Sequence, residues 1–203
     1  TNTDTNQESA SEKSVLTPIP ESILRNDQTA RFSSATWFQY LKDLGDIDII
    51  GLGGIGSWAS LAIARLDPNN IRLFDNDIVE VVNLAGQLYL NNHIRNYKVD
   101  AIKELIQATS RYYKINTFRQ RVVDTTILNP RVVCCLDNME SRKTCFNNWK
   151  QTLHIMPEIK KEAFFIDGRL NAEEFQIFFI KGEDTYNIDR YSQDFLFDDS
   201  AVD

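Results

Sequence analysis

The chain has 203 residues, of which 42% are apolar and 25% are charged, as is usual for a soluble globular protein. This length suffices for one well-cored domain with a short additional segment. The net charge of −7 comes without a basic cluster that would bind nucleic acid, and no apolar run is long enough to span a membrane. We therefore expect neither nucleic acid nor a membrane as a partner. We also expect a cytoplasmic location, because the three cysteines are too few for a disulfide framework.

The composition divides the chain into three parts. Residues 1–24 are rich in Thr, Asn, Ser and Glu and hold too little apolar surface to order alone, so we expect a flexible N-terminal arm. Residues 25–182 are expected to form one folded domain. Residues 183–203 carry seven acidic residues against one arginine, and we expect an acidic C-terminal segment that is a truncated or processed continuation.

Strand and helix patterns alternate within the domain. A helix is expected to begin near Ser33 or Ser34, since either residue suits an N-cap. Short apolar runs predict buried strands, and apolar residues at helical spacing predict helices. In chain order the later elements are strand 47–50, helix 57–66, strand 71–74, helix 98–114, strands 117–123 and 132–136, helix 138–151, and strands 164–166 and 175–180. This order predicts an α/β fold: a doubly wound, Rossmann-like and mostly parallel sheet with helices on both faces and trailing antiparallel strands.

A glycine loop at residues 51–56, Gly-Leu-Gly-Gly-Ile-Gly, joins the first of these strands to the helix that follows. Gly51 permits a tight turn, and Gly53 and Gly54 let backbone N–H groups approach a phosphate. Gly56 lets the helix pack onto the strand, and the helix N-terminus adds partial positive charge. The loop therefore predicts a phosphate site, with a glycine turn that binds no ligand as the alternative.

Asp75 stands at the end of the next strand, where a carboxylate accepts hydrogen bonds from ribose hydroxyls. A glycine loop with such a carboxylate suits a nicotinamide dehydrogenase as well as an ATP-binding enzyme. These two features therefore predict a nucleotide without identifying it.

Three further segments separate these two classes of enzyme. The run 75–80, Asp-Asn-Asp-Ile-Val-Glu, leads to 83–87, Asn-Leu-Ala-Gly-Gln, and Lys98 then opens a helix. Cys-Leu-Asp-Asn at 135–138 follows a buried strand. Together with the glycine loop, these segments resemble the ThiF/MoeB superfamily, which includes the ubiquitin-activating enzymes, over residues 31–180.

The resemblance implies a ThiF-like nucleotide-binding domain in an adenylyltransferase, which joins ATP to the C-terminal carboxylate of a ubiquitin-like or peptide partner and releases pyrophosphate. By position, Asp75 would hold the ribose, and Asp137 would lie by the Mg²⁺ and the phosphates. Lys98 would neutralise the β- and γ-phosphates. Asn83 and Gln87 would line the phosphate side of the site.

Several of these residues also have a structural interpretation. Asp77 either supports the nucleotide ligands or is a solvated loop residue. Lys98 is otherwise a solvated lysine in the first turn of its helix, and Asn83 is otherwise a turn residue. Asp137 otherwise caps the helix that begins near Asn138.

Of two arginines in the family pattern, one is replaced in this sequence and the other has only a candidate. The family string Asn-Leu-x-Arg-Gln has Gly86 at the position of the arginine that contacts the triphosphate, so either catalysis is weaker or Arg95 or Lys98 supplies the charge. Arg31 is the candidate for the N-terminal arginine finger, with a plain surface arginine as the alternative. In many relatives a neighbouring subunit supplies this finger, so we expect a homodimer. The segments around Trp58 and Gly86 look like those of ThiF-like proteins from phages and mobile elements.

The three cysteines, Cys134, Cys135 and Cys145, are expected to be reduced core residues, with a reactive Cys145 as the alternative. No Cys-x-x-Cys pair occurs, and His93 and His154 have no partner at ligand spacing, so we expect no zinc.

The sequence leaves three functions open. The first is an adenylyltransferase that uses ATP and Mg²⁺. The second is a non-catalytic nucleotide-binding or structural module that kept the fold after losing the arginine at Gly86. The third is a nicotinamide-dependent oxidoreductase.

Overall fold

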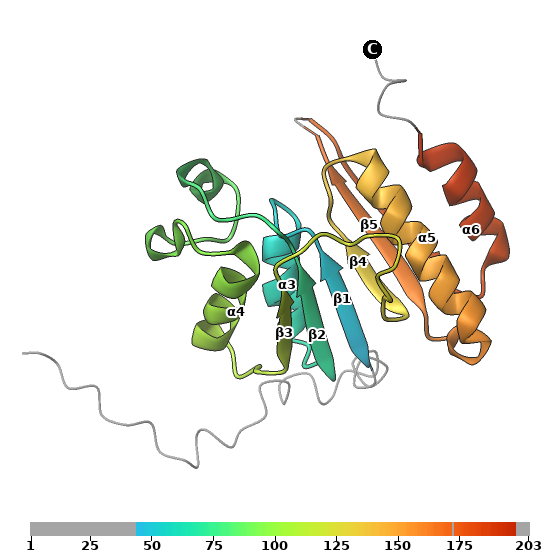
Figure 1. Cartoon of the computed structure of the whole chain (residues 1–203), viewed down its shortest axis with the longest axis horizontal. Coiled ribbons are helices and arrows are strands. Elements are labelled where there is room, and N and C mark those ends of the chain that lie inside the picture. The colour runs from blue at the N-terminus through green and yellow to red at the C-terminus, as the bar shows by residue number, and fades with distance from the viewer. Residues whose placement is uncertain (1–43, 172, 198–203) are drawn as a thin grey trace, which may run out of the picture.

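The computed structural model describes residues 44–171 and 173–197 of the chain. A six-stranded sheet lies at its centre (Figure 1), with the strand order β3-β2-β1-β4-β5-β6. The neighbours from β3 to β5 are parallel, and β6 is antiparallel to β5. This arrangement confirms the predicted doubly wound, mostly parallel sheet and its antiparallel end. The helix expected near Ser33 and the candidate Arg31 lie outside the described residues.

The elements alternate as predicted, and α6 and the short turns are additional. In chain order they are β1 (Asp46–Ile50), α3 (Gly56–Ala64), β2 (Asn70–Phe74), the 3₁₀ turns η2 (Val81–Ala85) and η3 (Asn91–His93), α4 (Lys98–Thr109), β3 (Ile115–Phe118), β4 (Arg131–Cys134), α5 (Met139–Ile155), the 3₁₀ turn η4 (Pro157–Ile159), β5 (Phe164–Leu170), β6 (Phe175–Lys181), α6 (Thr185–Arg190) and the π-helical turn η5 (Tyr191–Phe195).

Some element boundaries differ from the prediction. Strand β3 ends at Phe118, and residues 119–123, expected to continue it, form a loop instead. The reason is that β2, the strand beside it, ends at Phe74, directly opposite Phe118. Strand β5 continues to Leu170 where a loop was expected, because β6 pairs with it along its whole length.

Helix α4 is shorter than predicted and ends at Thr109. The hydroxyls of Thr109 and Ser110 donate to the backbone carbonyls of Leu105 and Ile106, and Tyr112 then enters the core.

Helices lie on both faces of the sheet (Figure 1), and apolar side chains pack beneath them. Ile47 and Ile49 of β1 belong to the core under α3 and α4, whereas Ile50 packs on the other side with Phe146 and Trp149 of α5. Helix α6 lies on the α5 side, where the η5 residue Tyr191 is buried. This double coverage explains why the parallel strands consist of nearly continuous apolar runs.

Cys134 and Cys145 lie where the sheet meets α5, whereas Cys135 packs against the core on the α3 side. Cys134 and Cys145 are buried and Cys135 is half-buried, and none of them forms a disulfide. Contact with Cys134, together with burial, raises the pKa of the Cys145 thiol well above its usual value. A thiol that stays protonated is a poor nucleophile, which favours the core interpretation of Cys145.

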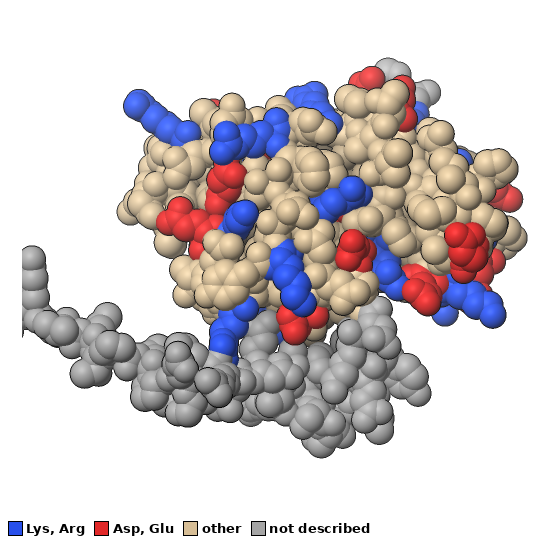
Figure 2. Space-filling model, turned by 60° about the horizontal axis from the view of Figure 1, so that its bottom comes forward, with Lys and Arg blue, Asp and Glu red and all other residues tan. Residues whose placement is uncertain are grey.

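The surface in Figure 2 shows lysines and arginines interspersed with acidic residues, so this face carries no continuous basic track. None of the helices in the described ranges is both long and apolar enough to cross a membrane.

Candidate functional site

A cleft of about 390 Å³ opens at the carboxyl ends of the parallel strands. It lies where the strand order reverses between β1 and β4, the usual ligand position in doubly wound sheets. Residues that follow β1, β2, β3 and β4 line it, together with Gly168 of β5. The structure brings together at this cleft most of the predicted site residues: Gly51, Gly53, Gly54, Asp75, Asp77, Gln87, Lys98 and Asp137.

The glycines of the loop serve two different purposes. Gly51 has a φ of 83°, and a Cβ on Gly56 would lie 1.8 Å from the carbonyl oxygen of Gly51, so the chain itself requires both glycines. A Cβ on Gly53 would meet no atom within 4 Å, and Gly53 faces the cleft. The space over Gly53 therefore suits a ligand that must approach the backbone closely.

Backbone donors border this space. The N–H groups of Gly53 and Gly54 have no backbone acceptor within the described part of the chain, and α3 begins two residues later. Unpaired N–H groups at a helix N-terminus bind anions, so the loop fits a phosphate.

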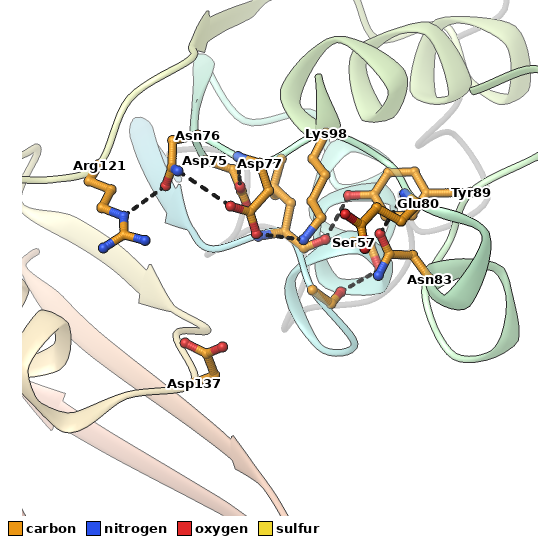
Figure 3. A network of polar contacts seen from close by, with 12 residues as sticks. Ser57, Asp75, Asn76, Asp77, Glu80, Asn83, Tyr89, Lys98, Arg121 and Asp137 are labelled. Atoms are coloured by element: carbon orange, nitrogen blue, oxygen red, sulfur yellow. Dashed lines mark hydrogen bonds and ion pairs between the residues drawn. The ribbon is translucent and has the colours of Figure 1, made fainter. Parts of the chain in front are cut away.

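The glycine loop is held in place by side chains (Figure 3). The N–H of Leu52 donates to Asp75 Oδ2 at 2.7 Å, and its carbonyl accepts from the buried hydroxyl of Tyr89 at 2.6 Å. The hydroxyl of Ser57 donates to the carbonyl of Gly53 at 2.7 Å. These hydrogen bonds within the chain fix the loop, so nucleotide binding would require little reorganisation.

Asp75 is well placed for a ribose. Its second oxygen, Oδ1, accepts from the N–H of Asp77 at 2.8 Å. Burial raises the pKa of the Asp75 carboxyl, and the N–H donors of Asp77 and Leu52 partly offset this effect. Each carboxylate oxygen keeps a further acceptor site, so Asp75 has the capacity to accept a hydroxyl.

Lys98 is buried at the start of α4, which is at odds with a solvated lysine. Its Nζ lies 3.0 Å from Asp77 Oδ2, and its backbone N–H donates to the carbonyl of Asp77 at 2.9 Å. Asp77 thus holds Lys98 at the cleft (Figure 3). The ammonium group has three N–H donors, so two remain for a phosphate.

Asp137 lies across the cleft, after β4 (Figure 3). It does not cap α5, because the cap is Asn138, whose Oδ1 accepts from the N–H of Ser141 at 2.9 Å. The Nδ2 of Asn138 donates to Asp137 at 3.1 Å, and the carboxylate is otherwise exposed. Within the described ranges, no group of three His, Cys, Asp or Glu residues could hold a metal ion. Mg²⁺ nevertheless fits this position, because one carboxylate plus nucleotide phosphates is a usual ligand set.

Gln87 and Asn83 differ in what surrounds them. The Oε1 of Gln87 is buried at the cleft without a hydrogen-bond partner, and a buried polar atom of this kind can be satisfied by a ligand. Asn83 lies outside the cleft, beside a smaller hollow that it shares with Lys98. Its Oδ1 accepts from the N–H of Glu80 at 2.9 Å and closes the η2 turn, as its structural interpretation predicted.

The position of the missing arginine lies close to the cleft without lining it. The carbonyl of Gly86 accepts from Trp58 Nε1 at 3.2 Å, and Gln87 beside it lines the cleft. Of the two residues expected to replace the charge, Lys98 lines the cleft and Arg95 does not.

The predictions missed Gln120 and Arg121, which also line the cleft. Both were assigned to a strand, and no motif marks them. The Nε of Arg121 donates to Asn76 Oδ1 at 3.0 Å, so the end of β2 anchors the guanidinium (Figure 3).

Arg142 is buried in the wall of the cleft and stabilises it. It donates to the carboxylate of Asp167 on β5 and to the carbonyl of Leu136. The carboxylate also accepts from Arg169 at 2.6 Å and from the hydroxyl of Tyr191 at 2.7 Å. Asp167 thus joins β5, the start of α5 and η5 in one polar cluster.

The comparison with known families agrees with this geometry. The model of the ThiF family matches residues 27–154. The chain belongs to the ThiF family. This membership confirms the resemblance that the glycine loop and the segments after it predicted.

Two curated relatives are similar to this ThiF-family chain. The molybdopterin-synthase adenylyltransferase of Haemophilus influenzae is 27% identical over 135 residues, which cover 63% of the chain and 54% of that protein. The tRNA threonylcarbamoyladenosine dehydratase of Escherichia coli is 35% identical over 80 residues, which cover 39% of the chain and 30% of that protein. The matched residues thus span about half or less of each curated relative.

Solved structures share the fold. The Escherichia coli dehydratase in complex with ATP matches with a TM-score of 0.51 and 25% identity, over 58% of this chain and 51% of that one. Escherichia coli MccB in complex with AMPCPP and MccA matches with a TM-score of 0.58 over 80% of this chain and 51% of that one. At 14% identity, the second match shows the ThiF fold alone.

Proposed function

We propose that this ThiF-family chain binds ATP in the cleft and transfers the adenylyl group to the carboxylate of a peptide or protein partner. One observation carries the proposal: the open cradle at Gly53, the fixed carboxylate of Asp75 and the ammonium of Lys98 line the same cleft. A nucleoside triphosphate needs all three, for its phosphates and its ribose. The dehydratase solved with ATP and the curated adenylyltransferase support this choice of nucleotide and reaction.

The proposed reaction is an in-line displacement at the α-phosphorus. A carboxylate oxygen of the partner attacks and forms the new P–O bond, while the bond from the α-phosphorus to the bridging oxygen breaks. Pyrophosphate leaves with that electron pair, and no proton moves because the attacking carboxylate is ionised. The product is an acyl adenylate.

The chain's own residues position and neutralise the reactants. The N–H groups of Gly53 and Gly54 hold the phosphates, and Asp75 fixes the ribose and hence the in-line geometry. Lys98 offsets the charge that develops on the leaving pyrophosphate. When bound at Asp137, Mg²⁺ would supply further charge neutralisation on the phosphates.

A non-catalytic nucleotide-binding module remains the second hypothesis, and Gly86 favours it. Without the arginine, Lys98 is the predicted cation at the phosphate end, and part of its charge is offset by Asp77. Dimerisation, the role of Arg31 and the relationship to phage proteins stay predictions.

Exchange of radioactive pyrophosphate into ATP tests the reaction. We expect exchange that depends on Mg²⁺ and on a peptide carboxylate, with peptides ending in Gly-Gly as the first probe. Asp137→Ala is expected to abolish the exchange and to keep the thermal unfolding transition. Asp124→Ala removes an exposed carboxylate that does not line the cleft, so it serves as the matched control and should exchange like the wild type.

Two results would contradict the proposal. If Asp137→Ala exchanges as fast as the wild type, the role of Asp137 is wrong. If the wild type binds ATP but supports no exchange with any peptide carboxylate in a panel, the chain is a binding module.

A further inference from the structure

The cleft has a direction, given the proposed function on which this inference rests. The glycine loop and Lys98 mark the phosphate end, and Asp75 marks the ribose. Figure 3 shows Arg121 on the opposite side of Asp75 from Lys98, beyond Asn76. A nucleotide whose phosphates and ribose occupy the first two places therefore extends its base toward Arg121.

The lining suits a base at that end. Phe74, the last residue of β2, lines the cleft together with Val122 and Leu136, which follow β3 and β4. Phe74 stacks on Phe118 with ring centroids 4.5 Å apart and an interplanar angle of 9°, so its position is well fixed. An apolar wall supports one face of a planar base and leaves the other face to be covered.

Arg121 is the cleft cation whose donors are least engaged. Lys98 pairs with Asp77, and Arg142 is buried with Asp167 and backbone carbonyls. Arg121 is exposed, and its Nε bond to Asn76 is its one hydrogen bond within the described residues. This hydrogen bond holds the guanidinium at the cleft, and its remaining N–H groups have no partner among the described residues.

We propose that Arg121 is a nucleotide-binding residue that covers the base of the bound nucleotide with its guanidinium plane. A guanidinium stacks on an aromatic face through cation–π attraction and planar contact, which a lysine reproduces poorly. The tether to Asn76, the neighbour of Asp75, sets the plane at a fixed place relative to the ribose. Arg121 thus contributes at the base end, remote from the phosphates.

Competition binding on the full chain tests this assignment. Adenosine, ATP and inorganic tripolyphosphate would each displace a fluorescent N-methylanthraniloyl-ATP from the wild type and from Arg121→Ala, Arg121→Lys and Arg119→Ala. We expect Arg121→Ala to weaken adenosine and ATP by a similar factor, about tenfold, and to leave tripolyphosphate unchanged. Arg121→Lys should recover little of the loss.

Arg119→Ala is the matched control, because Arg119 pairs with Asp100 at 2.8 Å and does not line the cleft. It should bind all three competitors like the wild type. A loss of tripolyphosphate binding in Arg121→Ala would make Arg121 a phosphate ligand and overturn the assignment, and so would unchanged adenosine binding. If the wild type binds no ATP at all, the proposed function fails and this assignment with it.

Discussion

At the scale of single residues, the cleft separates positions that the fold needs from positions that a ligand needs. Gly51 and Gly56 are fixed by backbone conformation and close packing, whereas Gly53 lines the cleft and has open space where a Cβ would stand. The sequence predicted the loop because glycine is the residue that such turns demand. It could not predict that Asp77 holds Lys98, because that ion pair depends on how the chain returns to α4.

The open space at Gly86 allows the family arginine to be restored. Gly86→Arg is expected to fit without displacing the fold and to lower the KM for ATP in pyrophosphate exchange by about tenfold, because a guanidinium binds phosphate bidentately. Gly86→Gln, a long side chain without charge, should leave the KM as it is. Equal KM values for Gly86→Arg and the wild type would show that the missing arginine does not limit ATP binding.

At the scale of elements, periodicity predicted every strand and helix from β1 to β6, because a buried parallel sheet imposes apolar runs on its strands. The ends of the elements were less predictable. Strand β3 stops where β2 stops, and that limit comes from the neighbour and not from the residues of β3. Because the end of β3 was predicted too late in the chain, Arg121 was assigned to the strand, whereas it lines the cleft.

The start of α5 offers a test that separates capping from catalysis. Asn138→Ala is expected to lower the free energy of unfolding by about 1 kcal/mol, because the side chain that caps the N–H of Ser141 is lost. Asp137→Ala should leave this free energy within about 0.5 kcal/mol of the wild type, as an exposed substitution usually does. Urea unfolding followed by circular dichroism measures both values. A larger loss for Asp137→Ala than for Asn138→Ala would assign the cap to Asp137 after all.

At the scale of the whole molecule, the described residues cover both faces of the sheet except near β6. Its alternate residues Phe175, Ile177 and Phe179 are more than half exposed, as is Leu170 of β5 beside the cleft. The doubly wound type of sheet could be predicted from the sequence, because crossover connections between parallel strands are almost always right-handed. The polar cluster at Asp167, which connects η5 to the cleft wall, could not be predicted, because Arg142 and Tyr191 are far from Asp167 in the sequence.

The central claim is that the cleft binds ATP with its phosphates over Gly53. Isothermal titration of ATP into the wild type, Gly53→Ala and Gly86→Ala tests it most directly, because neither added methyl group meets an atom of the described chain within 4 Å. We predict that the wild type binds ATP in preference to NAD, that Gly53→Ala binds it at least about tenfold more weakly, and that Gly86→Ala matches the wild type. Wild-type affinity for ATP in Gly53→Ala, or a preference of the wild type for NAD, would contradict the claim.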